Sequence, residues 1–276
     1  METAVFSAAS LFDDQGISPR VPVPSARHRV LLLIAASFLS LSFSAATEDE
    51  MQVDADEQTQ SMDYVERSHE FPGMELSIRE FSCHQLNANL LWPGTFLFAD
   101  WLVKNKSILH GRKILELGSG TGALAIFLWK AFQVDTTTSD YDDEEIEENI
   151  AYNCKANNLN VLPHIRHTWG DQFPVLKPDW DIVIASDILL YVKQYPNLVK
   201  TLSFLLKEYK GTSQNDGSTA ITTKSGTQVP LKLPMFLMSW RRRIGKDQSL
   251  FFEACEKASL EVQHLGDLVY LIKEKN

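Results

Sequence analysis

From about residue 64 onward, apolar residues fall into two kinds of pattern along this chain. Short apolar runs bounded by Gly, Pro, Asn or Asp are typical of buried strands, and apolar residues three or four positions apart are typical of helices that cover a sheet. The predicted strands are residues 113–117, 134–139, 164–168, 180–187 and 234–240. The predicted helices are residues 97–103, 122–132, a segment with Ile146, Ile150 and Cys154, a segment with Leu198, Leu202, Leu205 and Leu206, and residues 248–258.

The order of these elements predicts the fold. Strands and helices alternate, and residues 260–272 then form two further strands joined at Gly266 and Asp267. Such alternation gives a parallel sheet with helices on both faces, which binds ligands beyond the carboxyl ends of its strands. We therefore predict a doubly wound α/β fold with a mostly parallel, seven-stranded sheet and a C-terminal antiparallel hairpin. Asp140 and Asp142 are the predicted caps of the helix after the second strand.

One domain is predicted over residues 63–276, because a chain of 276 residues with 44% apolar residues can build one large core. Residues 210–230 are rich in Gly, Ser, Thr, Asn and Asp, so we predict a flexible insertion there rather than a domain boundary. A loop of this length is functional or mobile.

Residues 1–62 are predicted to be an N-terminal extension, either disordered or a targeting segment. Residues 30–46 are apolar except for four serines and follow several basic residues, which resembles a signal sequence. However, Asp13 and Asp14 precede this run, and it is short for a membrane span. A membrane or secretory segment, an organellar presequence and a stretch without a role in the fold remain alternatives. Residues 47–62 are polar and acidic and are predicted to be a disordered linker.

The net charge of −10 is local. Of the 36 acids, 13 lie in two runs, at residues 48–57 and 140–148, and the other 23 nearly balance the 26 lysines and arginines. No broad basic face is present, so we predict no nucleic-acid partner. Cys83, Cys154 and Cys255 are widely spaced, which indicates free thiols in a reducing compartment. The seven histidines form no ligand pair, and no metal site is predicted.

The run ILELGSGTGAL, residues 114–124, carries the clearest chemistry. An apolar strand ends at an acid, Glu116, followed by Gly118, Gly120 and Gly122 and then by an apolar helix. Glycines let a ligand approach the main chain closely, so this unit is typical of a loop that holds a nucleoside cofactor. A carboxylate beside the loop repels a pyrophosphate and suits a cationic ligand, which favours S-adenosylmethionine over NAD.

The glycine spacing alone leaves NAD open. Gly118, Gly120 and Ala123 also fit the dinucleotide pattern G-x-G-x-x-G/A, and Asp140 lies 22 residues after Gly118, near the expected position of a ribose-binding acid. A turn that only joins strand to helix is the third alternative.

Several further segments make the chain resemble the seven-β-strand (class I) S-adenosylmethionine-dependent methyltransferases, and among them the methyltransferase-like group that includes non-SET protein-lysine methyltransferases. The resemblance covers residues 64–272. It rests on LLWPGTFLFADWL (residues 90–102), the glycine run, Asp140, TWGD (168–171) and WDIVIASDILLY (180–191). The closing hairpin also fits that fold, whereas an all-parallel dinucleotide fold has none.

The resemblance implies S-adenosyl-L-methionine as the cofactor and assigns residues to its parts. The residues implied at the cofactor are Trp92, Glu116, Gly118, Gly120, Gly122, Asp140, Tyr141, Trp169 and Ser186. Asp187 and Tyr191 are implied at the acceptor, where the methyl group is transferred. Plain packing remains an alternative for Trp92, Trp169 and Tyr191, and helix capping for Asp140. Asp171 is expected near Trp169, or as the cap of a turn.

The chain departs from the family pattern at the acceptor. Lysine-specific members carry an acid, two residues and then an aromatic, whereas here Asp187 is followed by Ile188, Leu189 and Leu190, with Tyr191 one place late. This weakens the prediction of a lysine acceptor more than that of the cofactor. We predict a methyltransferase that acts on a lysine of a protein; a small-molecule methyltransferase and a non-catalytic, methyltransferase-like binding protein are the alternatives.

The predicted enzyme is a monomer of the cytoplasm or nucleus. Membrane association, or an organellar location, would come only through residues 30–46, if these are retained.

Overall fold

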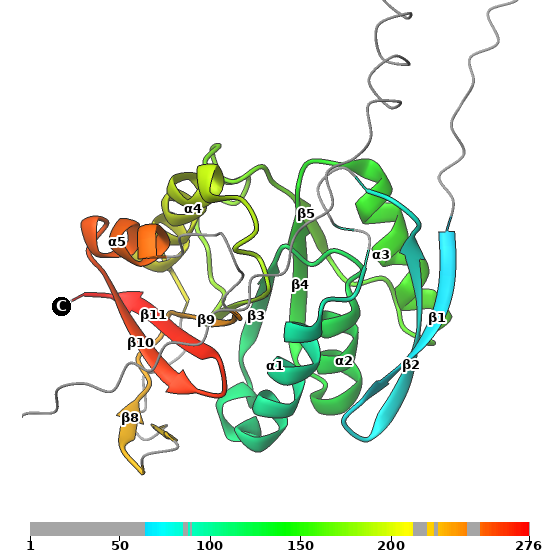
Figure 1. Cartoon of the computed structure of the whole chain (residues 1–276), viewed down its shortest axis with the longest axis horizontal. Helices are drawn as coiled ribbons and strands as arrows, with labels where there is room; N and C mark the ends of the chain where they lie inside the picture. The colour runs from blue at the N-terminus through cyan, green and yellow to red at the C-terminus, as the bar shows by residue number, and fades with distance from the viewer. Residues whose placement is uncertain are drawn as a thin grey trace, which may run out of the picture. The chain divides into compact units, whose positions relative to one another are not determined.

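The computed structural model describes residues 64–84, 88, 90–211, 220–223, 226–241 and 249–275. A seven-stranded sheet with the order β10-β11-β9-β6-β3-β4-β5 forms its centre (Figure 1). The parallel neighbours are β9 (Met235–Ser239), β6 (Ile182–Ser186), β3 (Lys113–Leu117), β4 (Asp135–Asp140) and β5 (His164–Arg166). β10 (Leu260–Gly266) and β11 (Val269–Glu274) form an antiparallel hairpin, and β11 also pairs antiparallel with β9. The predicted fold class is confirmed.

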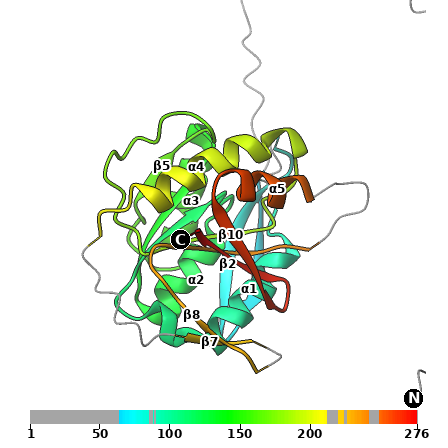
Figure 2. The ribbon, with the colours of Figure 1, turned by 90° about the vertical axis from the view of Figure 1, so that its left-hand side faces the viewer.

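Helices cover both faces of the sheet, because successive side chains of a strand point to opposite faces. Ile114 and Ile182 lie in the core under α1 (Pro93–Lys104), α2 (Ala123–Phe132) and α3 (Glu144–Ala156). Their neighbours Leu115 and Val183 lie in the core under α4 (Tyr195–Lys207) and α5 (Ser249–Lys257), which Figure 2 shows side by side. Two short 3-10 helices, η2 (Lys106–Leu109) and η3 (Val192–Gln194), follow α1 and precede α4.

The predicted cap of α3 is wrong. Neither Asp140 nor Asp142 caps this helix; the N-cap is Asp143, whose carboxylate accepts a hydrogen bond of 2.9 Å from the Glu145 backbone N–H. Asp140 is the last residue of β4, and its carboxylate is used elsewhere. The carboxylates of all three acids can cap a helix. Which of them does so depends on the length of β4 before the helix begins.

A second hairpin, which the apolar pattern did not predict, precedes the sheet. It consists of β1 (Tyr64–Phe71) and β2 (Met74–Phe81), and Figure 1 shows it at the opposite end of the molecule from the β10–β11 hairpin. β2 pairs with β1 on one edge and contacts α3 on the other. Its buried face combines two apolar residues with a charged one, Leu76, Ile78 and Glu80, which obscures the period of two.

Three asparagines dock this second hairpin: Asn149 and Asn153 of α3 and its C-cap residue, Asn157. Asn149, Asn153 and Asn157 recur every four residues on one buried face of the helix. Their amide groups bond the backbone N–H and C=O groups of Ser77 and Arg79 at 2.7 to 3.1 Å. The side chains thus replace a neighbouring strand along β2, which satisfies backbone groups that would otherwise be buried without partners.

The predicted insertion contains two short strands, β7 (Ala220–Thr222) and β8 (Gln228–Pro230), which pair antiparallel. The rest of that prediction concerns residues 212–219, 224 and 225, which lie outside the described residues, as do residues 1–63. The predictions for the N-terminal extension and for residues 30–46 therefore stay predictions. Within the described part of the chain, no helix is long and apolar enough to cross a membrane.

Candidate functional site

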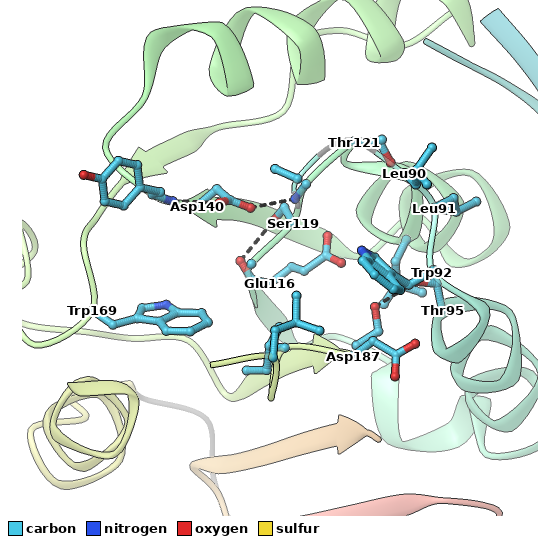
Figure 3. Close-up of a pocket in the computed structure, with 18 of the residues that line it drawn as sticks. Leu90, Leu91, Trp92, Thr95, Glu116, Ser119, Thr121, Asp140, Trp169 and Asp187 are labelled. Carbon is cyan, nitrogen blue, oxygen red and sulfur yellow. Dashed lines mark hydrogen bonds between the residues drawn. The ribbon is translucent and has the colours of Figure 1, made fainter. Parts of the chain in front are cut away.

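A cavity of about 310 Å³ opens at the carboxyl ends of β3, β4, β5 and β6. This volume lies at the lower end of the range for small-molecule sites. The cavity brings together all the predicted site residues except one: Trp92, Glu116, Gly118, Gly120, Asp140, Tyr141, Trp169, Ser186, Asp187 and Tyr191 line it. Figure 3 shows Trp92 and Trp169 on opposite sides of the cavity with Glu116 between them.

The exception is Gly122, which lies outside the lining of the cavity. It is the N-cap of α2 with a φ of 75°, and a Cβ there would meet the Ile150 side chain at 3.0 Å. Its position fits close packing of α2 against α3. Asp171 is also absent from the lining and is exposed.

The glycine loop is held in shape by a serine between the first two glycines. The Ser119 backbone N–H and hydroxyl both bond the Ser139 carbonyl at the end of β4, at 3.1 and 3.3 Å. Gly118 has a φ of 65°, and a Cβ there would lie only 2.8 Å from Ile188 Cγ2. Positive φ and this close approach both require glycine at that position.

Burial strongly perturbs the Glu116 carboxyl group of the cavity. Its side chain is 2% exposed, and its Oε2 atom has no hydrogen-bond partner among the described residues. Burial raises its pKa to about 8, which a backbone hydrogen bond from Ala125 in the first turn of α2 only partly opposes. A buried carboxyl oxygen that points into a cavity without a partner is suited to a ligand that donates hydrogen bonds or carries positive charge.

Asp140 connects β4 to the glycine loop. Its Oδ2 atom accepts a 2.7 Å hydrogen bond from the Gly120 backbone N–H, and Oδ1 accepts one of 2.8 Å from that of Tyr141. Burial raises the pKa of Asp140, and these two hydrogen bonds oppose the rise. Tyr141 beside it is 41% exposed at the rim of the cavity.

Trp169 sits on a turn that α4 supports, which sequence reasoning missed. The hydroxyl of Thr201 in α4 bonds both the Gly170 backbone N–H and the His167 ring, each at 3.0 Å. A Cβ on Gly170 would meet Asn197 at 2.8 Å, so this turn lies directly against α4. His167 also lines the cavity, and burial lowers its pKa. The contact joins residues more than 30 positions apart, and no local pattern signals it.

Asp187 occupies a constrained position at the end of β6. Its φ is 52°, in a region that residues other than glycine rarely adopt. Asp187 is 4% exposed. Its backbone N–H bonds the Ser239 carbonyl at 3.0 Å, while its Oδ2 atom accepts a 2.7 Å bond from the Gly94 backbone N–H. Since no side chain of its own caps α1, Asp187 acts as a distant cap for that helix. Its Oδ1 atom has no hydrogen-bond partner among the described residues.

The start of α1 is held from two further sides. Ser239 Oγ donates to the Gly94 carbonyl at 2.8 Å, and the hydroxyls of Thr95 and Ser186 lie 2.9 Å apart. Gly94 can only be glycine here, because a Cβ would lie 2.5 to 2.8 Å from the Asp187 carboxylate. The ends of β6 and β9 thus position the helix that follows Trp92.

Both residues at the departure from the family pattern, Leu190 and Tyr191, line the cavity. The sequence left open whether Tyr191 could reach the site, and the structure places it there. Among the charged residues of the lining, Glu116, Asp140 and Asp187 are acids, and the one base, Lys193, is exposed. No group of three or more His, Cys, Asp or Glu side chains in the described residues could hold a metal ion.

Comparison with known proteins assigns the family. A model of the lysine methyltransferase family matches residues 70–213, which is more than half of the chain. The chain belongs to that family. A solved structure of the T. thermophilus 16S rRNA N2 G1207 methyltransferase (RsmC), in complex with AdoMet and guanosine, superposes with a TM-score of 0.50 at 16% identity, over 78% of this chain and 51% of that one. The predicted family, and with it the cofactor S-adenosylmethionine, is confirmed, and the superposition agrees with the predicted fold.

Curated relatives are similar over part of their length. EEF1A lysine methyltransferase 3 of Xenopus tropicalis is 29% identical over 51% of this chain and 64% of its own length. Histone-arginine methyltransferase METTL23 of Xenopus laevis is 28% identical over 42% and 51%. Protein N-terminal and lysine N-methyltransferase efm7 of Aspergillus fumigatus is 26% identical over 50% and 58%. The matches thus span between about half and two thirds of these relatives.

Proposed function

We propose that this protein transfers a methyl group from S-adenosylmethionine to a lysine side chain of a protein. The observation that carries the proposal is the buried Glu116 carboxyl group, whose Oε2 has no partner among the described residues, beside a glycine loop in a cavity that two further acids, Asp140 and Asp187, also line. A nucleotide pyrophosphate would meet repulsion there, whereas a cationic cofactor is stabilised. The lysine acceptor is supported by the family and by the names of relatives that print a lysine activity.

The residues of the cavity fit the proposed cofactor. Glu116 would hold its positively charged end, Gly118 and Gly120 would let it approach the main chain, and Asp140 with Tyr141 would face its ribose and adenine. Trp92 and Trp169 provide the apolar faces on either side. When bound, S-adenosylmethionine supplies a methyl group that its sulfonium already activates.

The side chains of this protein then have to position a neutral amine and exclude water. Positioning alone accounts for about 7–11 kcal/mol in well-oriented reactions. The cavity lining includes the apolar residues Leu90, Trp92 and Leu190, and an apolar lining favours the deprotonated amine, because desolvation disfavours its charged form. Asp187 Oδ1, which has no hydrogen-bond partner among the described residues, could accept a hydrogen bond from an amine N–H, and Tyr191 is a further polar residue of the lining. Asp187 therefore orients the acceptor and is no strong base.

We place the protein in the cytoplasm or the nucleus, as a monomer without nucleic-acid partners. Its three cysteines are free thiols, two of them buried, which supports a reducing compartment. We place the domain boundary at residue 63, before β1 (Tyr64–Phe71), the first element of the described residues.

The test is to incubate the purified protein with radiolabelled S-adenosylmethionine and a cell extract. We expect label on one or a few protein bands, and methyl-lysine in those bands by mass spectrometry. Label only in small molecules would indicate a small-molecule methyltransferase. Binding of the cofactor without any label transfer would instead indicate a binding protein.

A further inference from the structure

The β1–β2 hairpin contributes a buried charge that reaches the cavity wall. Glu80 of β2 is 2% exposed, and its carboxylate has three partners. Oε2 accepts from Arg67 Nη1 of β1, whereas Oε1 accepts from His69 Nε2 at 3.0 Å and from the Leu91 backbone N–H at 3.2 Å. Glu80 does not line the cavity, but Leu91 does.

The wall that Leu91 belongs to faces the glycine loop. Ala88, Leu90, Leu91 and Trp92 all line the cavity, and the Ala88 carbonyl lies 3.8 Å from the position of a Cβ on Gly120. Figure 3 shows Leu90, Leu91 and Trp92 together on the side of the cavity beyond Thr121 and Glu116. Movement of this segment would change the space available to a ligand.

The hairpin is also tied to the glycine loop itself. Asn153, which bonds the Arg79 backbone of β2, donates a further 2.9 Å hydrogen bond to the Thr121 carbonyl. Phe96 of α1 packs against His69 and Phe71 of β1, with ring centroids 5.9 and 5.2 Å apart. The hairpin therefore contacts Leu91 directly and is linked to the glycine loop through Asn153 of α3.

We infer that Glu80 is a positioning residue of the cofactor site: through Leu91 it holds the wall of residues 90–92 at the distance from the glycine loop that the cofactor needs. This inference rests on the proposed function. The relevant contact is the hydrogen bond from Leu91 to Oε1. The ion pair with Arg67 stabilises Glu80 but is not needed for the wall, because Arg67 is half exposed and can be solvated.

Two substitutions of the same size separate these contacts. In Glu80→Gln the amide oxygen can take the place of Oε1 and accept from Leu91 and His69, and only the Arg67 contact is lost. In Glu80→Met no comparable acceptor remains. Arg67→Ala removes the ion pair from the other side, and Glu75→Gln changes an exposed glutamate of the same strand as a control.

The measurements are S-adenosylhomocysteine binding by calorimetry, melting temperature, and amide hydrogen exchange of Leu91 without ligand. We expect Glu80→Gln and Arg67→Ala to lose some melting temperature and to keep the dissociation constant within about threefold of wild type. Glu80→Met should weaken binding about tenfold, because the partly buried Leu91 N–H loses its acceptor, and should speed exchange at Leu91. Glu75→Gln should change none of these quantities.

The outcomes separate this inference from the proposed function. If wild-type protein binds no S-adenosylhomocysteine, the proposed function fails. If wild type binds and Glu80→Met binds equally well, or if affinity follows melting temperature across all variants, Glu80 is merely structural and the inference is overturned. Should Glu80→Met not fold, Glu80→Gln and Arg67→Ala still decide, since a tenfold loss of affinity in either contradicts the inference.

Discussion

At the residue scale, the three acids of the cavity differ in the hydrogen bonds that their carboxyl groups accept. Asp140 accepts two backbone hydrogen bonds and Asp187 accepts one. Glu116 keeps an oxygen that has no partner among the described residues, and burial raises the pKa of this group to about 8. Such a group costs stability in the ligand-free protein and gains interactions on binding. Glu116 is therefore where stability and cofactor binding should oppose each other.

The first prediction is the pH dependence of Glu116→Gln. The pKa of Glu116 rises from the ordinary 4.5 to about 8 on folding, so the folded state holds a proton that the unfolded chain releases between these values. The contribution of this group to the free energy of unfolding thus falls as the pH rises through that range. We expect ligand-free Glu116→Gln to melt above wild type at pH 8, and the difference to shrink toward pH 5. Equal melting curves at pH 8 would contradict the raised pKa.

The same substitution should weaken binding. Loss of a charged hydrogen bond costs about 1.5–3 kcal/mol, or roughly a tenfold to hundredfold increase in the dissociation constant of S-adenosylmethionine. Calorimetry at pH 8 measures it. A more stable variant that binds the cofactor as well as wild type would remove Glu116 from the site.

A second prediction at this scale concerns the acceptor side. In Gly94→Ala the new methyl group would lie within 2.8 Å of the Asp187 carboxylate, which must then leave the start of α1. We expect methyl transfer to fall at least tenfold while S-adenosylhomocysteine affinity stays within a few fold, the pattern of an interaction needed in the transition state. Asp187→Ala should show the same division. Ser239→Ala, which loosens the helix start without touching the carboxylate, is the control and should have a smaller effect.

The sequence predicted the site only where its residues follow one another in a motif. Glu116, Gly118 and Gly120 were found because the loop is a local pattern, and Asp140 because it ends the next strand. Gly94, Thr201 and Ser239 were missed because their roles arise from contacts across about 30 to 145 positions. Gly122 belonged to the motif and yet serves packing against Ile150.

At the element scale, α3 carries polar residues on a buried face. The apolar residues Ile146, Ile150 and Cys154 revealed this helix, while Asn149 and Asn153 are equally buried. Their function could not be predicted from α3 alone, since their partners are backbone groups of β2. The β1–β2 hairpin was not predicted because the backbone groups at the free edge of β2 bond side chains of a helix and not another strand. Its buried face also includes a glutamate.

A third prediction tests this docking. Asn153→Ala leaves the Arg79 N–H and the Thr121 carbonyl without their partner, and each buried unsatisfied group costs about 1–3 kcal/mol. For a domain of this size, a loss of about 2 kcal/mol lowers the melting temperature by roughly 4–8 °C. Lys155→Ala, on the exposed side of the same helix, should change it by less than about 1 °C. Calorimetric melting of both variants gives the answer, and equal stability would exclude a docking role for Asn153.

At the scale of the whole molecule, all described elements lie between Tyr64 and Glu274, and the ends of four neighbouring strands converge on one cavity. The doubly wound order of strands was predictable because each strand–helix unit is local and such sheets bind ligands at one edge. The identity of the proposed acceptor could not be predicted in this way, because the surface of the acceptor also takes part in that recognition.

The last prediction concerns which part of the chain folds alone. A shortened protein that begins at Asp63 keeps every described strand and helix, so we expect it to be soluble and monomeric and to gain melting temperature from S-adenosylhomocysteine, since a ligand that binds only the folded state stabilises it. A second form that begins at Cys83 lacks the β1–β2 hairpin and exposes the buried asparagines of α3. We expect that form to aggregate or to lose the ligand-induced shift.

Gel filtration and melting curves distinguish the two forms. If the form from Asp63 is insoluble, the domain begins earlier than predicted; if the form from Cys83 behaves like it, the hairpin has no part in the site. Fractionation of cells that express the full chain or the form from Asp63 tests residues 30–46 as well, because membrane association should disappear with the removed segment.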